Sequence, residues 1–168
     1  MSPFRPDLVD CWMFRVATSA RSVTSIEVLL IRRAPGRILP GLWQCVSGTV
    51  EADERIAVAA LRELREETGF GPGDIEGFYD LDLVNQFHEP SVDAVMTSAV
   101  FAARLRPDAE PTLSAEHDGA RWLAIGDAHT EVIWPGYRTA LERIRDDLAD
   151  PERATWFALT LDGQRPTD

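Results

Sequence analysis

Apolar and β-branched residues gather early in the chain in two segments that are typical of β-strands. They cover residues 9–16 and 26–33, and a polar stretch that includes Ser19 and Ser22 separates them. Short apolar runs bounded by polar residues predict two strands joined by a loop. Residues 34–42 then hold two prolines and two glycines, which exclude a helix or regular strand and predict a surface loop.

The pattern then changes from strand-like to helical. Residues 43–50 predict a short strand that leads into a turn. Residues 54–68 predict a helix, because Ala57, Leu61 and Leu64 recur at helical spacing. Gly69 follows at once and is expected to end the helix, since glycine adopts the left-handed cap conformation at little cost.

The second half of the chain returns to strands and closes with a helix. Residues 75–87 and 92–105 predict strands, and the second is apolar at both alternating sets of positions, so we expect it to be buried on both faces. A short strand is expected at residues 120–123 and an amphipathic helix at residues 137–148. This order predicts one α+β domain over residues 1–168, with helices packed on a sheet.

Composition narrows the class of protein. The chain has 168 residues, 45% of them hydrophobic, and a formal net charge of -11, which exclude a disordered or fibrous chain. The longest uncharged and mostly apolar run, residues 94–103, is too short to span a bilayer, and residues 1–7 contain no apolar signal core. Cys11 and Cys45 lie in apolar segments, so we expect no disulfide framework and a cytoplasmic location.

The acidic balance also restricts the partners. All 17 basic residues are arginine, and the sequence shows no basic patch of the kind that neutralises nucleic-acid phosphates. We therefore expect neither a nucleic-acid polymer nor a membrane as a partner.

The predicted helix at residues 54–68 carries an unusual set of acids. At 100° per residue, Glu63, Glu66 and Glu67 fall within an arc of about 100°, away from the apolar stripe. Like charges at this spacing repel, and acids near a helix C-terminus oppose its dipole. Such oxygen clusters suit hard cations such as Mg²⁺ or Mn²⁺. A plain solvated face is the alternative, with Arg62 and Arg65 pairing locally with the acids.

The surrounding residues favour the cation. The complete run is Gly48-x5-Glu54-x7-Arg62-Glu63-Leu64-x-Glu66-Glu67-x-Gly69-Phe70. It matches the Nudix box, G-x5-E-x7-R-E-U-x-E-E-x-G-U with U an apolar residue, at every defined position of residues 48–70. The chain therefore resembles the Nudix hydrolases, and the resemblance extends to the strands before the box and the strands and helix after it.

The resemblance implies an αβα sandwich around a mixed β-sheet and a set of roles for the box residues. Glu63, Glu66 and Glu67 match the metal-binding carboxylates of the family, often assisted by a backbone carbonyl, here that of Gly48. Arg62 matches an arginine that orients a box glutamate. Glu54 would stand at the start of the helix and pair with Arg62.

Two places depart from the family pattern. Residues 46–48 read Val-Ser-Gly where many members have Pro-Gly-Gly, and Arg55 stands where many have a Ser or Thr helix cap. Asp53 is the expected replacement for that cap. We expect the start of the helix to be affected, and not the chemistry.

A catalytic base is also needed, and family members often take a further glutamate from a loop beyond the box. Glu116 is the candidate here, because it lies six residues before Trp122 in the following strand. A solvated loop acid is the alternative reading of Glu116. His117 and His88 are the competing bases, and the box glutamates Glu63 and Glu67 are the other catalytic candidates that accept the proton.

The resemblance also suggests a substrate. Residues 29–33, 42–51, 116–117 and 122–123 look most like dihydroneopterin triphosphate diphosphatases, which remove pyrophosphate from a pterin triphosphate. Arg32 and Arg33 end a strand beside the loop before the box and are candidates for contacts with substrate phosphates. Trp43 is a candidate for stacking on a planar base, together with Phe87 and Trp134, although aromatic residues at such places are as often part of the core.

The expected function is divalent-metal-dependent hydrolysis of a phosphoanhydride bond in a nucleoside-triphosphate-like substrate, with release of pyrophosphate or phosphate. Dihydroneopterin triphosphate and (d)NTPs are the first candidates, and dinucleoside polyphosphates, ADP-ribose and nucleotide sugars are the alternatives. A Nudix-fold module that senses a nucleotide without cleaving it is the non-enzymatic alternative. A homodimer is compatible with the family resemblance, and the charge of -11 predicts strict metal dependence, since a polyanion would otherwise be repelled.

Overall fold

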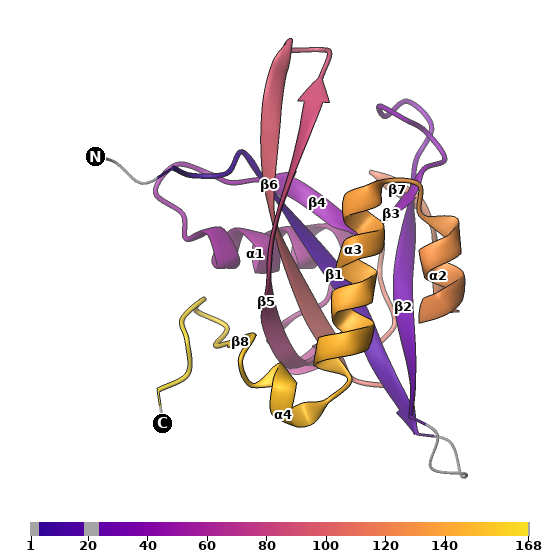
Figure 1. The fold of residues 1–168 in the computed structure, drawn as a ribbon. Helices are drawn as coiled ribbons and strands as arrows, with labels where there is room; N and C mark the ends of the chain where they lie inside the picture. Colours follow the sequence, from indigo (N-terminus) through magenta and orange to yellow (C-terminus); the bar gives the residue numbers. More distant parts are fainter. Residues whose placement is uncertain (1–3, 19–23, 168) are drawn as a thin grey trace.

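The computed structural model describes residues 4–18 and 24–167 (Figure 1). The loop predicted between the first two strands lies mostly outside these residues. The strands are β1 (Leu8–Thr18), β2 (Thr24–Arg33), β3 (Trp43–Gln44), β4 (Val46–Thr49), β5 (Ile75–Glu89), β6 (Ala94–Leu105), β7 (His117–Ala124) and β8 (Ala158–Leu159). The helical segments are α1 (Ile56–Thr68), η1 (Pro72–Asp74), α2 (Ile125–Glu131), α3 (Pro135–Arg143), η2 (Ile144–Leu148) and α4 (Pro151–Ala154).

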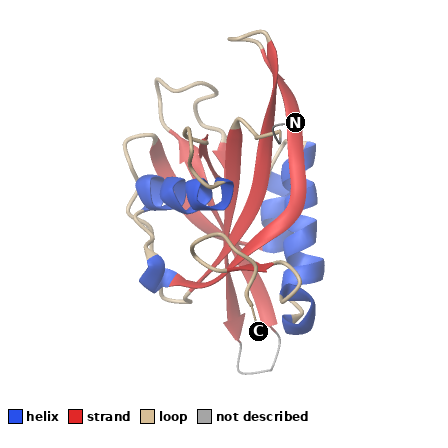
Figure 2. Ribbon diagram, turned by 90° about the vertical axis from the view of Figure 1, so that its left-hand side faces the viewer, coloured by secondary structure: helices blue, strands red, loops and turns tan. Residues whose placement is uncertain are grey.

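The described strands form one mixed sheet. Its order is β3-β2-β1-β6-β5-β8, while β4 pairs with β1 and β7 pairs with β2. The β1–β6 pair is parallel and the other pairs are antiparallel. Helix α1 lies on one face of the sheet and α3 on the other (Figure 2). The predicted α+β class and αβα sandwich are therefore confirmed.

Strands β1 and β2 diverge, and a short piece of chain fills the fork between them. Residues 13–18 of β1 pair with β2, whereas residues 8–11 pair with β4. Strand β3 pairs with the end of β2. The single short strand predicted at residues 43–50 is thus two strands with Cys45 between them, because the two ends of the segment bond to different neighbours.

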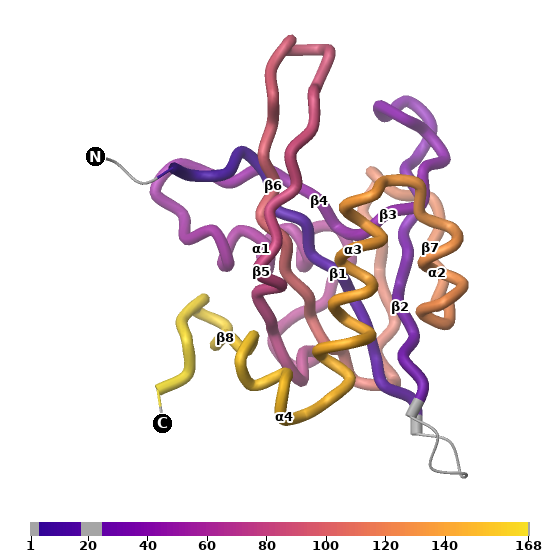
Figure 3. Tube along the Cα trace, in the orientation of Figure 1, coloured from indigo at the N-terminus to yellow at the C-terminus, as the bar shows by residue number. Residues whose placement is uncertain are grey.

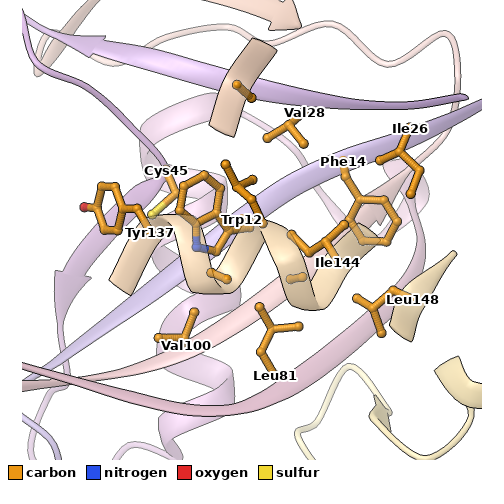
Figure 4. Close-up of a cluster of buried hydrophobic side chains, with 14 of the residues drawn as sticks. Trp12, Phe14, Ile26, Val28, Cys45, Leu81, Val100, Tyr137, Ile144 and Leu148 are labelled. Atoms are coloured by element: carbon orange, nitrogen blue, oxygen red, sulfur yellow. The ribbon is translucent and has the colours of Figure 1, made fainter. Parts of the chain in front are cut away.

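The central strand β1 separates two hydrophobic cores. Trp12 and Phe14 point to the core under α3, whereas Cys11 and Met13 point to the core under α1. On the α3 side the Trp12 ring meets the Tyr137 ring edge to face, with 5.1 Å between centroids (Figure 4). Alternate residues of a strand point to opposite faces, so a continuous apolar run such as β1 serves both cores.

Helix α1 begins later than the sequence predicts. Its first residue is Ile56, and the preceding Arg55 makes no side-chain capping bond. The prediction that Asp53 caps the helix is wrong, because Asp53 lies in a tight turn two residues further upstream, with a φ of 62°. Gly69 does end the helix, with a φ of 75° and its N–H donating to the Arg65 carbonyl.

The later elements also differ in detail. The helix predicted at residues 137–148 begins at Pro135, and its last turn, η2, is π-helical. Strand β6 is largely buried from Thr97 to Leu105, but its first residues form an exposed hairpin with β5 that projects from the body (Figure 3). The expectation of burial on both faces is therefore right only for the second part of β6. Over the residues described, no helix has the length and apolar character of a membrane span.

Candidate active site

The box acids on α1 differ in their surroundings. Glu63 and Glu67 lie one turn apart and are buried against the sheet, with 9% and 5% of their surface exposed. The Glu66 side chain is mostly exposed. The sequence predicted one face for all three acids. In the structure Glu63 and Glu67 lie on the buried side of this face, whereas Glu66 lies at its solvent-exposed edge.

Gly48 in β4 makes room for the Glu63 carboxylate. A Cβ at this position would collide with the carboxyl carbon and both carboxyl oxygens of Glu63. The box glycine is therefore required by close packing between the strand and the side chain of α1, and not by its backbone dihedral angles.

Arg62 organises the outer part of the site. Its Nε and Nη2 donate to the two carboxyl oxygens of Glu54 at 2.9 and 3.1 Å, and Nη2 also donates to the Thr49 carbonyl. Its Nη1 donates to Glu63 at 2.8 Å and to Glu66 at 3.3 Å. The fork geometry of the guanidinium thus holds three box acids, Glu54, Glu63 and Glu66, and the turn before α1. These bonds also hold the pKa of Glu54 below its usual range.

Glu67 is the least compensated acid of the site. Burial raises its pKa to about 8, and the charges of Glu63 and Glu116 add to this rise. Arg33 and the backbone N–H of Ser47 act in the opposite direction but do not cancel it. Its Oε2 atom is buried and makes no hydrogen bond with the residues that the structure describes. A buried acceptor of this kind is costly unless something else binds it.

The chain before β7 brings two further residues to Glu67. The N–H groups of Thr112 and Ser114 donate to the carbonyls of Thr68 and Glu67 at 2.8 and 2.9 Å. These bonds satisfy carbonyl groups that the end of a helix leaves free. They also place Glu116 and His117 beside the C-terminal turn of α1, although both are far from the box in sequence.

Glu116 and His117 occupy different places there. The half-exposed Glu116 carboxylate pairs with Arg37 at 2.8 Å and acts on Glu67 through its charge. His117 is buried, with Nε2 at 3.7 Å from Glu67 Oε2, and burial lowers its pKa. The ring is therefore neutral near pH 7. His88, the other competing base, lies in the β5–β6 hairpin beside Asp93 and not beside Glu67.

The two arginines at the end of β2 point to opposite faces of the sheet. Arg33 lowers the pKa of both Glu67 and His117 through its charge, and its Nε is buried without a hydrogen bond within the described residues. Arg32 pairs with Asp118 at 2.7 Å on the other face. The structure thus brings Arg33 to the box acids and directs Arg32 elsewhere. Gln44, which accepts a long bond from Arg33, is a buried site neighbour that no motif predicts.

The aromatic candidates are spread over the α3 side of the sheet. The Trp43 ring is covered by the Arg121 guanidinium, 4.1 Å from its centroid, and Arg32 lies 5.5 Å away. Phe87 and Trp134 keep 41% and 42% of their surface exposed. Stacking on a substrate ring is therefore open to Phe87 and Trp134, while one face of Trp43 is already used.

The donor set fits a hard cation in two respects. Glu67 Oε2 is a buried carboxylate oxygen without a partner, and the space in front of Gly48 is filled by a second carboxylate, that of Glu63. In residues 4–18 and 24–167, no three His, Cys, Asp or Glu side chains are already clustered closely enough to hold a metal. Arg62 draws Glu63 and Glu66 aside, so its guanidinium supplies the positive charge next to these acids.

Comparison with known proteins agrees with this geometry. The family described as "NUDIX domain" matches residues 13–144. An octanoyltransferase of Myxococcus xanthus is 37% identical over 119 residues, which are 70% of this chain. The chain spans only about a third (32%) of that relative's length. The bis(5'-nucleosyl)-tetraphosphatase [asymmetrical] of Sus scrofa is 32% identical over 109 residues, which are 62% of this chain and 69% of that protein.

Solved structures share the fold at low identity. A C. elegans Ap4A hydrolase in a binary complex matches with a TM-score of 0.70 and 20% identity, over 86% of this chain and 98% of the other. The E. coli dihydroneopterin triphosphate pyrophosphohydrolase matches with a TM-score of 0.62 and 23% identity, over 80% and 92% of the two chains. Both similarities concern the arrangement of the sheet and helices.

Proposed function

The chain belongs to the Nudix family, and we propose that it is a pyrophosphohydrolase that cleaves a phosphoanhydride bond of a nucleoside-triphosphate-like substrate. The observation that carries this proposal is the pair of buried acids on α1. Glu67 keeps an unpartnered oxygen beside Arg33, and Glu63 lies against Gly48. Buried carboxylates with a nearby arginine suit a cation and a phosphate bound together.

Nudix hydrolases generally use divalent metal ions, and the residues proposed to hold one here are Glu63, Glu66, Glu67 and the Gly48 carbonyl. Mg²⁺ or Mn²⁺ would supply the positive charge that polarises phosphoryl oxygens and activates water. This requirement is reinforced by the protein's net charge of -11, because a polyanionic substrate needs a local reversal of sign at the acidic face.

The side chains of the protein supply the remaining functions. Arg62 positions Glu63 and Glu66. Arg33, whose charge acts on Glu67, is proposed to bind a phosphate oxygen. Two acids are candidates to take the proton from the attacking water, Glu67 and Glu116. Glu67 is favoured by a pKa near neutrality, and Glu116 by its exposure and its position next to Glu67.

The substrate is proposed to be dihydroneopterin triphosphate or a nucleoside triphosphate. Residues 29–33 and 42–51, which carry the resemblance to pterin triphosphate enzymes, form the end of β2 and the segment in the fork beside the site. A dinucleoside polyphosphate is the second candidate, because the Sus scrofa tetraphosphatase is 32% identical to this chain.

A substrate panel tests these proposals. The protein is incubated with Mg²⁺ or Mn²⁺ and dihydroneopterin triphosphate, GTP, dATP, Ap4A or ADP-ribose, and the products are identified. Release of pyrophosphate from a triphosphate supports the first candidate, whereas cleavage of Ap4A supports the second. Metal-dependent binding without any product would overturn the enzymatic proposal in favour of a nucleotide sensor.

A further inference from the structure

A second polar group of side chains lies on the α3 face of the sheet, opposite the box acids. It consists of Asp10, Ser47, Asn85 and Ser98 and is called the Asp10 cluster below. The strand register places all four on one face, because Asp10 is opposite Ser47 and Asn85 is opposite Ser98. Asp10 and Ser98 are the buried members, with 4% and 1% of their surface exposed. Ser47 and Asn85 are only partly buried.

The Asp10 carboxylate has few partners for such a buried group. Asn85 Nδ2 donates to its Oδ2 at 3.4 Å, which is long for a hydrogen bond. The hydroxyls of Ser47 and Ser98 face it and partly offset the rise in pKa that burial causes. Ser98 Oγ nevertheless makes no hydrogen bond of normal geometry in the described part of the chain. An ionised carboxylate accepts up to about four hydrogen bonds, so acceptor capacity remains.

No structural role for this charge is evident. Within residues 4–18 and 24–167, no arginine or histidine forms an ion pair with Asp10, and none contributes to its pKa shift. A buried carboxylate without a cation destabilises a fold. A hydrophobic residue would serve the core under α3 better, as Trp12 does two residues later on the same face.

The cluster adjoins the reaction centre through one residue. The backbone N–H of Ser47 faces Glu67, whereas its hydroxyl faces Asp10. The charges of Asp10 and Glu67 both act on the thiols of Cys11 and Cys45. A molecule whose phosphates meet Glu67 therefore has the Asp10 cluster within reach across β4.

The residues around Asn85 suit the binding of a flat ring. At the start of α3, Gly136 is so close to the Asn85 amide that a Cβ would collide with it. Trp134 is half exposed two residues before this contact. Phe87 follows Asn85 by two residues on β5, so it shares the same face, and it is also half exposed. Exposed aromatic side chains next to polar groups can stack on a planar heterocycle.

We propose that the Asp10 cluster binds the heterocycle of the substrate and selects rings with two adjacent N–H donors, as in the 2-amino-4-oxopyrimidine ring shared by guanine nucleotides and pterins. This inference rests on the proposed function and names its substrate class. A ring N–H and a neighbouring amino group match the two oxygens of a carboxylate. The corresponding edge of adenine places a ring-nitrogen acceptor beside its amino group, which would oppose a carboxylate oxygen.

Binding measurements test the selection apart from turnover. Non-hydrolysable imido analogues of GTP and ATP are titrated into the full protein with Mg²⁺ by calorimetry. The GTP analogue should bind at least about tenfold more tightly, the range of one bidentate contact. Asp10→Asn keeps the shape but replaces an acceptor with a donor, so it should remove this preference. Asp82→Asn, at an exposed position of β5, is the matched control and should retain it.

A second comparison needs no variant and so does not depend on whether Asp10→Asn folds. The analogue of ITP lacks the 2-amino group and should bind the unchanged protein at least about fivefold more weakly than that of GTP. Equal binding of the GTP, ITP and ATP analogues, or an unchanged preference in folded Asp10→Asn, would overturn the inference. Selective binding without hydrolysis of any panel substrate would instead overturn the proposed function and leave the inference intact.

Discussion

The two faces of the sheet carry acids in opposite circumstances. On the α1 face, the box acids lie within one helical turn of each other, and Arg62 binds two of them directly. On the α3 face, Asp10 has no cationic partner in the described chain and one long bond from Asn85. Arg62 compensates two acids of the first group and the charge of Arg33 acts on the third, whereas no arginine of the described chain acts on Asp10.

If the two proposals hold, the α1 face carries the reaction and the α3 face selects the substrate. Phosphates are common to every candidate substrate, and the groups that suit them, Glu67 and Arg33, lie on the α1 face. The heterocycle is the part in which the candidates differ, and the α3 face offers polar groups with unused hydrogen-bonding capacity. Variants on the α1 face should therefore change turnover, and variants on the α3 face should change the preference among heterocycles.

The largest effect is expected from Glu67→Gln. The change keeps the size of the side chain but removes the carboxyl group proposed to bind the cation and accept the proton, so turnover should fall by about 10³-fold for every substrate. The order of preference among heterocycles should not change, because Asp10 is untouched. Initial rates on the substrate panel measure both quantities, and circular dichroism checks the fold.

Glu51→Gln is the matched control for this variant, since Glu51 is an exposed glutamate in the loop before α1. It should keep nearly normal turnover. Activity of Glu67→Gln within tenfold of the unchanged protein would contradict the assignment of Glu67 to the reaction.

A smaller effect should distinguish the two arginines of β2. Arg33→Ala removes a guanidinium beside Glu67 and should lower kcat/KM by about 10-fold to 100-fold, the range of one charge-assisted hydrogen bond. Arg32→Ala should lower it less than about threefold, because Arg32 is already paired with Asp118 and lies over Trp43. Steady-state measurements of kcat/KM for both variants on one substrate test this difference. A larger loss in Arg32→Ala would show that phosphates approach from the α3 face.

A further effect is expected in the pH dependence of stability without metal. The pKa of Glu67 is raised from 4.5 to about 8, so between these values the folded protein holds a proton that the unfolded chain has lost. The free energy of unfolding should therefore fall as the pH rises from about 4.5 to about 8, by at most roughly 1.4 kcal/mol per pH unit from this group.

Glu67→Gln removes this contribution, so its stability should decline less over the same range. Urea titrations of both proteins in a chelator, at intervals between pH 5 and pH 8, provide the comparison. If the free energy of unfolding changes with pH in the same way in both proteins, burial does not raise the pKa of Glu67.

The accuracy of the sequence predictions depends on whether the contacts that form an element are local. Helix α1 and its stop at Gly69 were predictable, because apolar spacing and a glycine cap act over a few neighbouring residues. The start of α1 was not, since the turn at Asp53 and the bonds of Glu54 to Arg62 replace an ordinary cap. Helix α2 was missed, because its sequence over residues 125–131 is short and carries no clear apolar period.

The site was predictable only where its residues are consecutive. The box identified Glu63, Glu66, Glu67 and Arg62, but their unequal burial depends on how α1 lies on β4. The pairing of Glu116 with Arg37 and the burial of His117 beside Glu67 come from the hydrogen bonds that hold residues 112–114 to the end of α1. No local pattern could have indicated these contacts.

The sequence by itself determined the family, the helix that carries the acids and the chemistry to which they are suited, because these depend on residue types at fixed short spacing. Only the tertiary structure decided that Glu67 is the acid without a partner and that Arg33, and not Arg32, lies near it. It also decided that Asp10 lies on the opposite face of the sheet from the box acids. The physical reason is that burial, charge compensation and strand register arise from segments far apart in the chain, which β1, β4, β5 and β6 bring together.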